Sequence, residues 1–344
     1  MYYYFAIILC LLLAVPFVVL ARRKCAEPLL DFSSDMSLSL KGILALLIVL
    51  HHSSQPLCNN GVKFFFDFWY WGPAIVGMFF FLTGYGLTRS VMTKDGYMKT
   101  FFKKRFLKLL PPYIIAIVIY QCYLACAGRF DWAVLADNFL KGIPPLTNSW
   151  YIIAIIFFYL LFYAVFRLIR SVKISVALMW LLSFLYIFAI NKIGWGNWWW
   201  KSTLAFNIGM TYVLFESKIK ETIARRTILF WVCMVVAFAL LFAFTYADLS
   251  VSFIEGFPSY SISYWLMPLF VLFAIYFTGM PKGRIFNFLG NISYELYIVH
   301  GVFVWLMPYN GNSILFLFCI YAVSILTATG LHWICTSMVK RYGL

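Results

Sequence analysis

Apolar stretches of about 20 residues recur along the whole chain, and each is long enough to cross a lipid bilayer as a helix. The chain has 344 residues, of which 64% are hydrophobic and 11% charged, whereas soluble domains contain about 25% charged residues. The polar connections are too short for a separate soluble domain. The sequence therefore predicts an all-α, polytopic membrane helical bundle with about eleven spans, near 3–20, 37–54, 72–88, 109–127, 150–169, 174–190, 198–215, 228–247, 261–279, 286–307 and 313–335.

Lysine and arginine residues alternate between the connecting loops, and this alternation predicts the orientation. Short cytoplasmic loops of membrane proteins are enriched in these residues. One set of loops holds 21 of them and the opposite set holds five. We expect the N-terminus outside and the C-terminus in the cytoplasm. The net charge of +15 then reflects topology and is no sign of nucleic-acid binding.

The first apolar stretch is interpreted as an uncleaved N-terminal transmembrane anchor at 1–24, followed by a ten-helix membrane domain at 37–336. Its basic residues, Arg22, Arg23 and Lys24, follow the apolar run and do not precede it, and no small-residue cleavage site is present. The eight cysteines show no CxxC spacing and lie mostly in apolar runs. We therefore expect neither a disulfide framework nor a metal site.

The stretch from Ser37 to Ser54 carries a lysine near one end and two histidines near the other. Lys41 and His52 are eleven residues apart, so a helix places them on one face, about 16 Å apart along its axis. Ionisable residues in a bilayer are costly and mark functional sites. A lysine can also extend to lipid phosphates, and that alternative stays open for Lys41. For His52 and its neighbour His51 the sequence favours proton transfer, because imidazole titrates near neutral pH.

A basic segment precedes the fourth predicted span and ends at Pro-Pro-Tyr113. Lys104, Arg105 and Lys108 lie at helical spacing within it. This pattern is typical of a positive cytoplasmic flank, and it also suits a clamp for phosphate groups. Before it, the run containing Thr83 offers small residues for close helix packing.

The tenth predicted span contains the acidic residue Glu295 near its middle and His300 closer to the outer side. Because the two residues are five apart, about 140° around a helix, only one of them can face His52 directly. Tyr297 and His300 are better neighbours at a spacing of three. His332 in the last span is interpreted as a hydrogen-bonded packing residue.

Taken together, these segments resemble the acyltransferase 3 family of integral-membrane acyltransferases, which acylate hydroxyl groups of surface glycans. Four elements carry the resemblance in the same order: a cation, ten residues and a histidine; an aromatic Phe-Phe-x-Leu-x-Gly run; a basic segment ending in Pro-x-Tyr; and an Ile-Ser-Tyr-x-x-Tyr-x-x-His signature. Here they are Lys41 to His52, Phe79 to Tyr85, Phe102 to Tyr113 and Ile292 to His300.

The chain departs from the family pattern at three positions. Lys41 and Lys108 stand where the family has arginine, and Thr83 stands where it has serine. Lysine keeps the positive charge but cannot form the bidentate contact that arginine makes with phosphate. Donor binding is therefore expected to differ in detail.

The resemblance implies transfer of an acyl group, acetyl above all, from cytoplasmic acyl-coenzyme A to a hydroxyl of a cell-surface or lipid-linked saccharide. It implies O-acetylation of an envelope polysaccharide by a multi-pass protein of the bacterial cytoplasmic membrane. The cosubstrate is acyl-CoA, and neither a permanently bound cofactor nor a metal is expected. The implied roles are catalysis by His52 with Glu295 or His300, donor binding by Lys41, Lys104, Arg105 and Lys108, and support by His51, Thr83, Tyr113 and Tyr297.

A second function class also fits the ionisable residues within the spans. A proton-coupled transporter or a flippase of a small polar solute would place lysine, histidine and glutamate along its substrate path. The sequence shows little of the internal repeat that carriers contain. Covalent transfer of a label from an acyl donor distinguishes this alternative from an acyltransferase.

Overall fold

The computed structural model describes residues 34–226, 228–229, 232–233, 236–237, 260–278 and 283–341. The predicted anchor at 1–24 and most of the predicted span at 228–247 lie outside these residues. Over the described residues the regular structure is helical throughout, without strands, as the sequence predicts. The helices are α2 (Ser34–Asn59), α3 (Gly72–Thr93), α4 (Phe101–Cys126), α5 (Trp132–Leu140), α6 (Trp150–Leu168), α7 (Val172–Ile193), α8 (Leu204–Arg225), α10 (Tyr260–Thr278), α11 (Arg284–Asn291), α12 (Ser293–Leu306) and α13 (Ser313–Arg341), with short 3-10 helices η1 (Lys63–Tyr70), η2 (Tyr97–Thr100) and η3 (Asn197–Trp199).

Six helical stretches of the described chain are long and apolar enough to cross a membrane, which confirms the prediction of a polytopic helical bundle. They are Asp35–Asn59, Lys63–Thr93, Tyr97–Cys126, Trp150–Leu168, Val172–Ile193 and Ser313–Arg341. The tenth predicted span, 286–307, is not one helix but two, α11 and α12. The break lies at Ile292, where the Ser293 hydroxyl donates a hydrogen bond to the Gly290 carbonyl at 2.8 Å.

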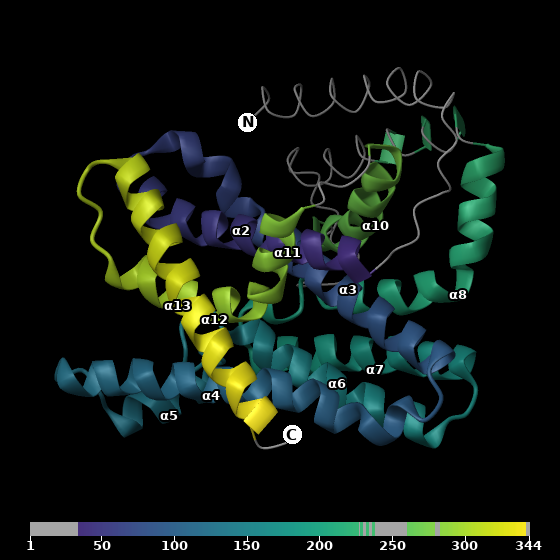
Figure 1. Ribbon diagram of the computed structural model, residues 1–344, viewed down its shortest axis with the longest axis horizontal. Helices are drawn as coiled ribbons and strands as arrows, with labels where there is room; N and C mark the ends of the chain where they lie inside the picture. Colours follow the sequence, from purple (N-terminus) through teal and green to yellow (C-terminus); the bar gives the residue numbers. More distant parts are fainter. Residues whose placement is uncertain are drawn as a thin grey trace.

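Helix α2 runs through the middle of the bundle and packs against α3, α11, α12 and α13 (Figure 1). Its buried apolar residues include Leu40, Leu44 and Ile48, spaced four apart, so they form one face. Glycines permit two of the closest contacts, since association of helices in lipid depends on close packing. A Cβ atom at Gly42 would lie 2.6 Å from the carbonyl oxygen of Phe286 in α11.

Helices α3 and α8 form the most extensive helix pair of the described chain. A Cβ atom at Gly84 of α3 would collide with the carbonyl of Phe206, and one at Gly209 of α8 with the carbonyl of Phe81. The small-residue run around Thr83 is therefore a packing face at Gly84. At Gly86 a Cβ atom would meet nothing within 4 Å, so that glycine takes no part in the contact.

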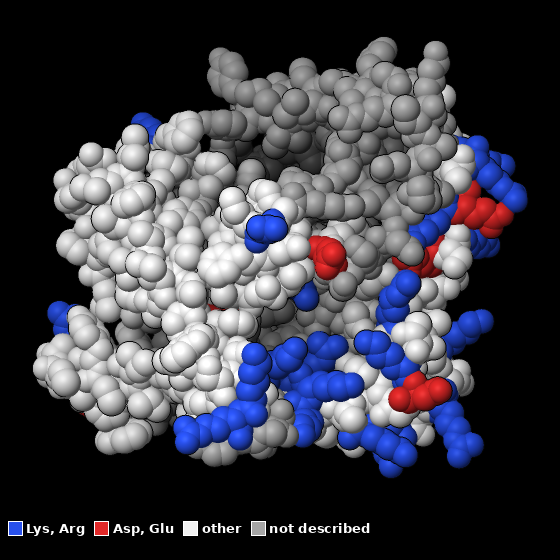
Figure 2. Space-filling view, viewed as in Figure 1, with Lys and Arg blue, Asp and Glu red and all other residues white. Residues whose placement is uncertain are grey.

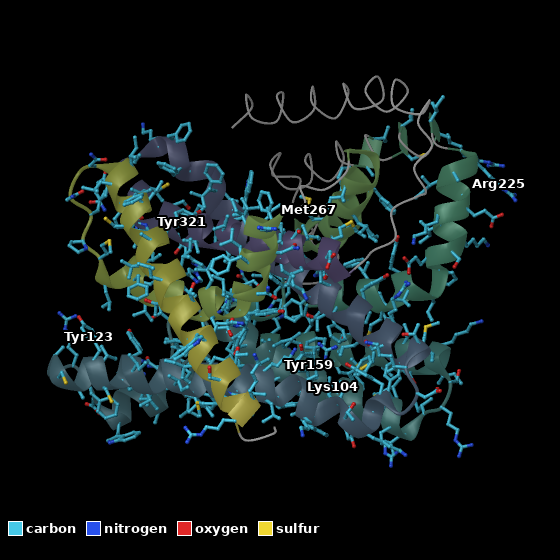
Figure 3. The ribbon with its side chains drawn as sticks, viewed as in Figure 1. Lys104, Tyr123, Tyr159, Arg225, Met267 and Tyr321 are labelled. Carbon is cyan, nitrogen blue, oxygen red and sulfur yellow. The ribbon has the colours of Figure 1, made fainter. Side chains whose placement is uncertain are left out.

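Lysine and arginine side chains gather at one end of the bundle. They come from the α3–α4 connection and from the last turns of α8 and α13. Figure 2 shows them along the lower and right-hand parts of this view, and Figure 3 labels Lys104 and Arg225 among them. We call this the basic end. The other end carries η1, residues 127–149, η3 and residues 307–312, with Tyr123 nearby (Figure 3), and we call it the loop end.

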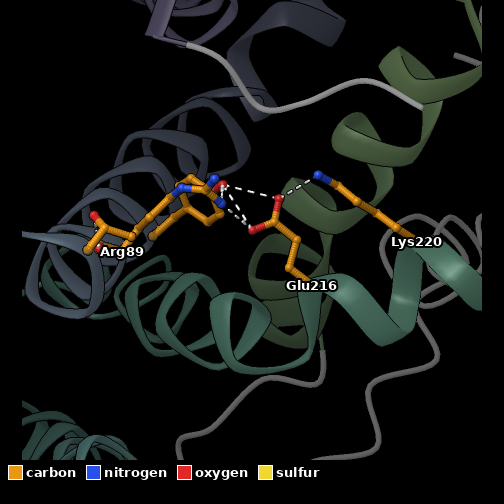
Figure 4. A network of polar contacts seen from close by, with 5 residues as sticks. Arg89, Glu216 and Lys220 are labelled. Atoms are coloured by element: carbon orange, nitrogen blue, oxygen red, sulfur yellow. Dashed lines mark hydrogen bonds and ion pairs between the residues drawn. The ribbon is translucent and has the colours of Figure 1, made fainter. Parts of the chain in front are cut away.

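A network of charged groups ties α3 to α8 at the basic end (Figure 4). Glu216, whose side chain is 7% exposed, accepts hydrogen bonds from Arg89 at 2.7 Å and from Lys220 at 2.9 Å. The hydroxyl of Tyr85 also contacts this carboxylate, at 3.1 Å. Because the buried carboxylate has two cationic partners, its charge is compensated, and the network fixes α3 against α8.

Candidate active site

Helix α2 places His51 and His52 in a buried position near its C-terminal end. The Nδ1 atom of His51 lies 3.0 Å from the carbonyl oxygen of Phe68 in η1. Because a carbonyl only accepts, Nδ1 is the protonated nitrogen and donates, which leaves Nε2 of a neutral ring as an acceptor. The ring packs directly over Gly72, where a Cβ atom would lie 2.6 Å from its Cε1 atom. Only a glycine at that position leaves room for the imidazole.

Three histidine rings form one cluster at the centre of the site. The ring of His52 lies 4.5 Å from that of His51 and 5.1 Å from that of His300, measured between centroids. His300 donates from Nδ1 to the Leu296 carbonyl at 3.1 Å within α12. Nδ1 of His52 and Nε2 of His300 are buried and have no hydrogen-bond partner among the described residues. Such groups cost about 1–3 kcal/mol each, and a hydrogen bond to a substrate or the uptake of a proton would remove that cost.

A cavity of about 720 Å³ opens at the loop end above this cluster. Both His51 and His52 line it, whereas His300 does not. Its aromatic walls include Trp69, Trp150, Trp198 and Trp305. This volume lies within the range of about 300–1,000 Å³ that is usual for small-molecule sites.

Glu295 does not reach the histidine cluster. Its Oε1 atom lies 2.9 Å from Nδ1 of His332 in α13. The structure therefore brings His300 to His52 and turns Glu295 toward α13, in agreement with the 140° between them on the helix. His332 is hydrogen-bonded, as the sequence indicates, but the identity of its partner could not be read from the sequence.

The loop before α6 forms the rim between the cavity and α12. Tyr297 donates a hydrogen bond to the Asn148 carbonyl at 2.8 Å, and its ring lies 5.7 Å from that of His300. Tyr113 and Ser149 share a hydrogen bond of 2.9 Å. Asn148 has a positive φ of 61°, a conformation that asparagine adopts more readily than most residues. The sequence analysis missed Asn148 and Trp150; the Pro-Pro-Leu-Thr-Asn-Ser-Trp run at 144–150 was the available signal.

At the basic end, three of the four predicted donor-binding residues come together. Arg105 and Lys108 of α4 lie close enough to Lys41 of α2 for their charges to act on its ammonium group. Arg105 is held by the hydroxyl of Tyr97, at 3.0 Å from Nε and 2.8 Å from Nη2. Lys104 is exposed on the outer side of the same helix. None of these cations lines the loop-end cavity.

A column of buried hydroxyl groups connects the two ends. Arg105 lies near the hydroxyl of Tyr159. The half-buried hydroxyl of Thr83 donates to the Phe79 carbonyl at 2.8 Å and lies near the hydroxyls of Tyr159 and Tyr151. The ring of Tyr151 lies 5.4 Å from that of Tyr297, and the ring of Tyr297 lies 5.7 Å from that of His300. Thr83 thus sits midway between the cations and the histidines, a position that its sequence motif did not reveal.

Among the described residues, no group of three or more histidine, cysteine, aspartate or glutamate side chains could hold a metal ion. Imidazole rings next to a cavity of this size can transfer protons to and from a bound molecule.

Comparison with known proteins gives one match. A family model described as an acyltransferase domain matches residues 39–334, from the first turns of α2 to the last part of α13. No curated protein and no solved structure matches the chain. The matched range contains every residue discussed in this site.

Proposed function

The chain belongs to the acyltransferase 3 family and is a membrane acyltransferase, and we propose that it moves an acetyl group from acyl-coenzyme A to a saccharide hydroxyl. In this proposal the basic end faces the cytoplasm of a bacterium and the loop end faces the outside. The acceptor is a cell-surface or lipid-linked saccharide, and the product is an O-acetylated glycan of the cell envelope.

The observation that carries the proposal is the histidine cluster, in which His51 and His52 line the cavity and two buried ring nitrogens have no hydrogen-bond partner among the described residues. His52 lies on the same helix as Lys41, about 16 Å further along the axis. This arrangement suits coenzyme A, because Lys41 can bind its phosphates at one end of α2 while the pantetheine arm extends toward His52 near the other end.

The donor is proposed to bind at the basic end. Lys41, Arg105 and Lys108 offer positive charge to the phosphate groups of coenzyme A, with exposed Lys104 at the entrance. The column of hydroxyl groups from Tyr159 to Tyr297 lies along the route from these cations to the histidines. Its side chains would move apart to admit the pantetheine arm.

The acceptor is proposed to bind in the loop-end cavity. Its tryptophan side chains offer flat apolar faces of the kind that pack against the C–H faces of sugar rings. Asn148 and Gln121, which also line the cavity, supply amide groups for sugar hydroxyls. The hydroxyl to be acylated would lie against His52.

In the reaction, His52 takes the proton of the acceptor hydroxyl while that oxygen attacks the carbonyl carbon of the thioester. The new C–O bond replaces the C–S bond, and the imidazolium returns its proton to the departing thiolate of coenzyme A. A general base of this kind contributes about 10²- to 10⁴-fold to the rate. His300 positions the ring of His52, and Glu295 holds α12 through His332.

The test is transfer of radiolabelled acetyl from acetyl-CoA to glycan in vesicles that contain the wild-type chain, Lys41→Ala or His52→Ala. We expect label in wild type and its loss in both variants. If wild type gives no more label than empty vesicles, acetyl-CoA is not the donor, and solute uptake by the same vesicles then tests the transport alternative.

A further inference from the structure

Helix α5 is a short element at the loop end that no part of the proposed reaction uses. Asp131 caps its start by accepting hydrogen bonds from the backbone N–H groups of Ala133 at 2.7 Å and Val134 at 3.4 Å. None of its nine residues is buried. Figure 1 shows α5 beside the end of α4, at the edge of the bundle.

The two sides of α5 meet different surroundings. Val134, Leu135 and Asn138 line the loop-end cavity. Trp132, Phe139 and Leu140, at positions i, i+7 and i+8, are 74%, 53% and 75% exposed. Trp132 and Leu140 lie about 120° and 160° around the helix from Asn138, whereas Phe139 is about 40° from Leu135 and borders the cavity side. The helix is therefore a thin wall, with the cavity on one side and a bare apolar surface on the other.

Helix α5 follows a helix whose exposed apolar side chains must face lipid. Helix α4 lies in a candidate membrane span and exposes Ile114, Val118 and Ile119 along its length. The chain then turns at Gly128, whose φ is 67°, and enters α5 beside the end of α4. Because α5 lies beside the end of this helix (Figure 1), the hydrocarbon that covers α4 is the apolar environment nearest to the exposed side chains of α5.

Length and composition place α5 at the membrane surface. Nine residues extend only about 13 Å, which is less than half of the hydrocarbon thickness. Tryptophan favours the boundary between lipid and water, and Trp132 stands at the start of the helix. Asp137 and Lys141 form an exposed ion pair of 2.6 Å on a side away from the apolar residues, as expected where that side meets water.

We propose that α5 lies in the outer interfacial layer of the bilayer, with Trp132, Phe139 and Leu140 in lipid and Val134, Leu135 and Asn138 closing the cavity. The partner of the apolar face is the lipid surface itself. It follows that the cavity is separated from the surrounding lipid by a single helix, and that the lipid holds this wall in place. The inference does not depend on which donor or acceptor the enzyme uses.

The test is photocrosslinking of the full chain in vesicles of radiolabelled phosphatidylethanolamine and phosphatidylglycerol. Benzoylphenylalanine replaces Phe139 or Trp132 on the apolar side, Asn138 on the cavity side, or Ile119 on α4 as a lipid-facing control. The exchanges at Phe139 and Trp132 put one aromatic side chain for another at exposed positions, so they leave folding intact.

We expect lipid adducts at Phe139 and Trp132 at the level of the Ile119 control, and their loss at Asn138. Adducts at Ile119 alone would show that α5 lies in water and would overturn the proposal. Crosslinks between two copies of the chain at Phe139 would assign the surface to a dimer, and lipid adducts of equal yield at Asn138 would refute the two-sided wall.

Discussion

Replacing Gly72 by alanine is expected to impair acyl transfer while the fold stays intact. Gly72 opens α3 and lies against the ring of His51, where an added Cβ atom would be 2.6 Å from Cε1 and 2.7 Å from Cδ2. Since carbon atoms approach to about 3.5 Å at best, the ring must move by nearly 1 Å.

Displacement of the His51 ring has two effects. It weakens the hydrogen bond to Phe68, worth about 1 kcal/mol, and it presses on His52, whose ring centroid is 4.5 Å away. Misplacement of a catalytic group by 1 Å can lower a rate by about 10²-fold. We expect Gly72→Ala to lower kcat by about 10- to 100-fold, with protein levels near those of wild type.

Gly86→Ala is the matched control, because Gly86 lies on the same helix and an added Cβ atom there meets nothing within 4 Å. Initial rates of acetyl transfer in vesicles, normalised to the amount of folded enzyme, give the comparison. A second comparison removes the ring: in a His51→Ala background, Gly72→Ala should have no further effect. Wild-type activity in Gly72→Ala would refute the argument that the position of His51 governs that of His52.

Three further variants test other parts of the structure. Gly84→Ala should prevent close approach of α3 and α8 and lower the yield of folded protein in fluorescence-detected size exclusion, whereas Gly86→Ala should not. Glu216→Ala removes the carboxylate that pairs with Arg89 and Lys220. Breaking a fully buried ion pair costs about 3–5 kcal/mol of stability, but Arg89 is 42% exposed, so we expect a loss of about 1–2 kcal/mol. The loss should appear as a lower thermal midpoint in detergent. Glu295→Gln keeps one hydrogen bond to α13 and should retain most activity if the glutamate only positions α12, whereas a loss as large as that of His52→Ala would give it a direct role in proton transfer.

The helical membrane architecture and the common helix of Lys41 and His52 were predictable from the sequence. Both follow from patterns within one segment, namely apolar length and the spacing of residues along a helix. The family resemblance also implied that Lys41 and Arg105 act together in donor binding, and the charge of Arg105 does act on Lys41 in the structure.

Contacts between distant segments were not predictable in the same way. The choice of His300 over Glu295 as neighbour of His52 depends on the rotation of α12, which one sequence does not specify. The partnership of Arg89 with Glu216 depends on the glycine contacts between α3 and α8, and Glu216 was therefore overlooked. The predicted span at 286–307 was identified by the length of its apolar run, and this criterion does not detect the break in the helix at Ile292.

Helix α5 is a third feature that was not predicted from the sequence. Residues 128–149 lie between the predicted spans 109–127 and 150–169, and no helix was predicted there. The signals were nevertheless present, with Asp131 as a helix cap and Trp132, Phe139 and Leu140 at the spacing of one helical face. Their meaning becomes clear only when the cavity on the other side of the helix is known.

The most direct test of the central claim is the rate of acetyl transfer by His52→Ala in vesicles, measured with radiolabelled acetyl-CoA. Cys58→Ala is the control, since Cys58 lies on the same helix α2 and does not line the cavity. We predict that His52→Ala falls to the level of empty vesicles at a normal protein level, while Cys58→Ala keeps wild-type activity. Transfer by His52→Ala at the wild-type rate would contradict the role of His52 as the general base.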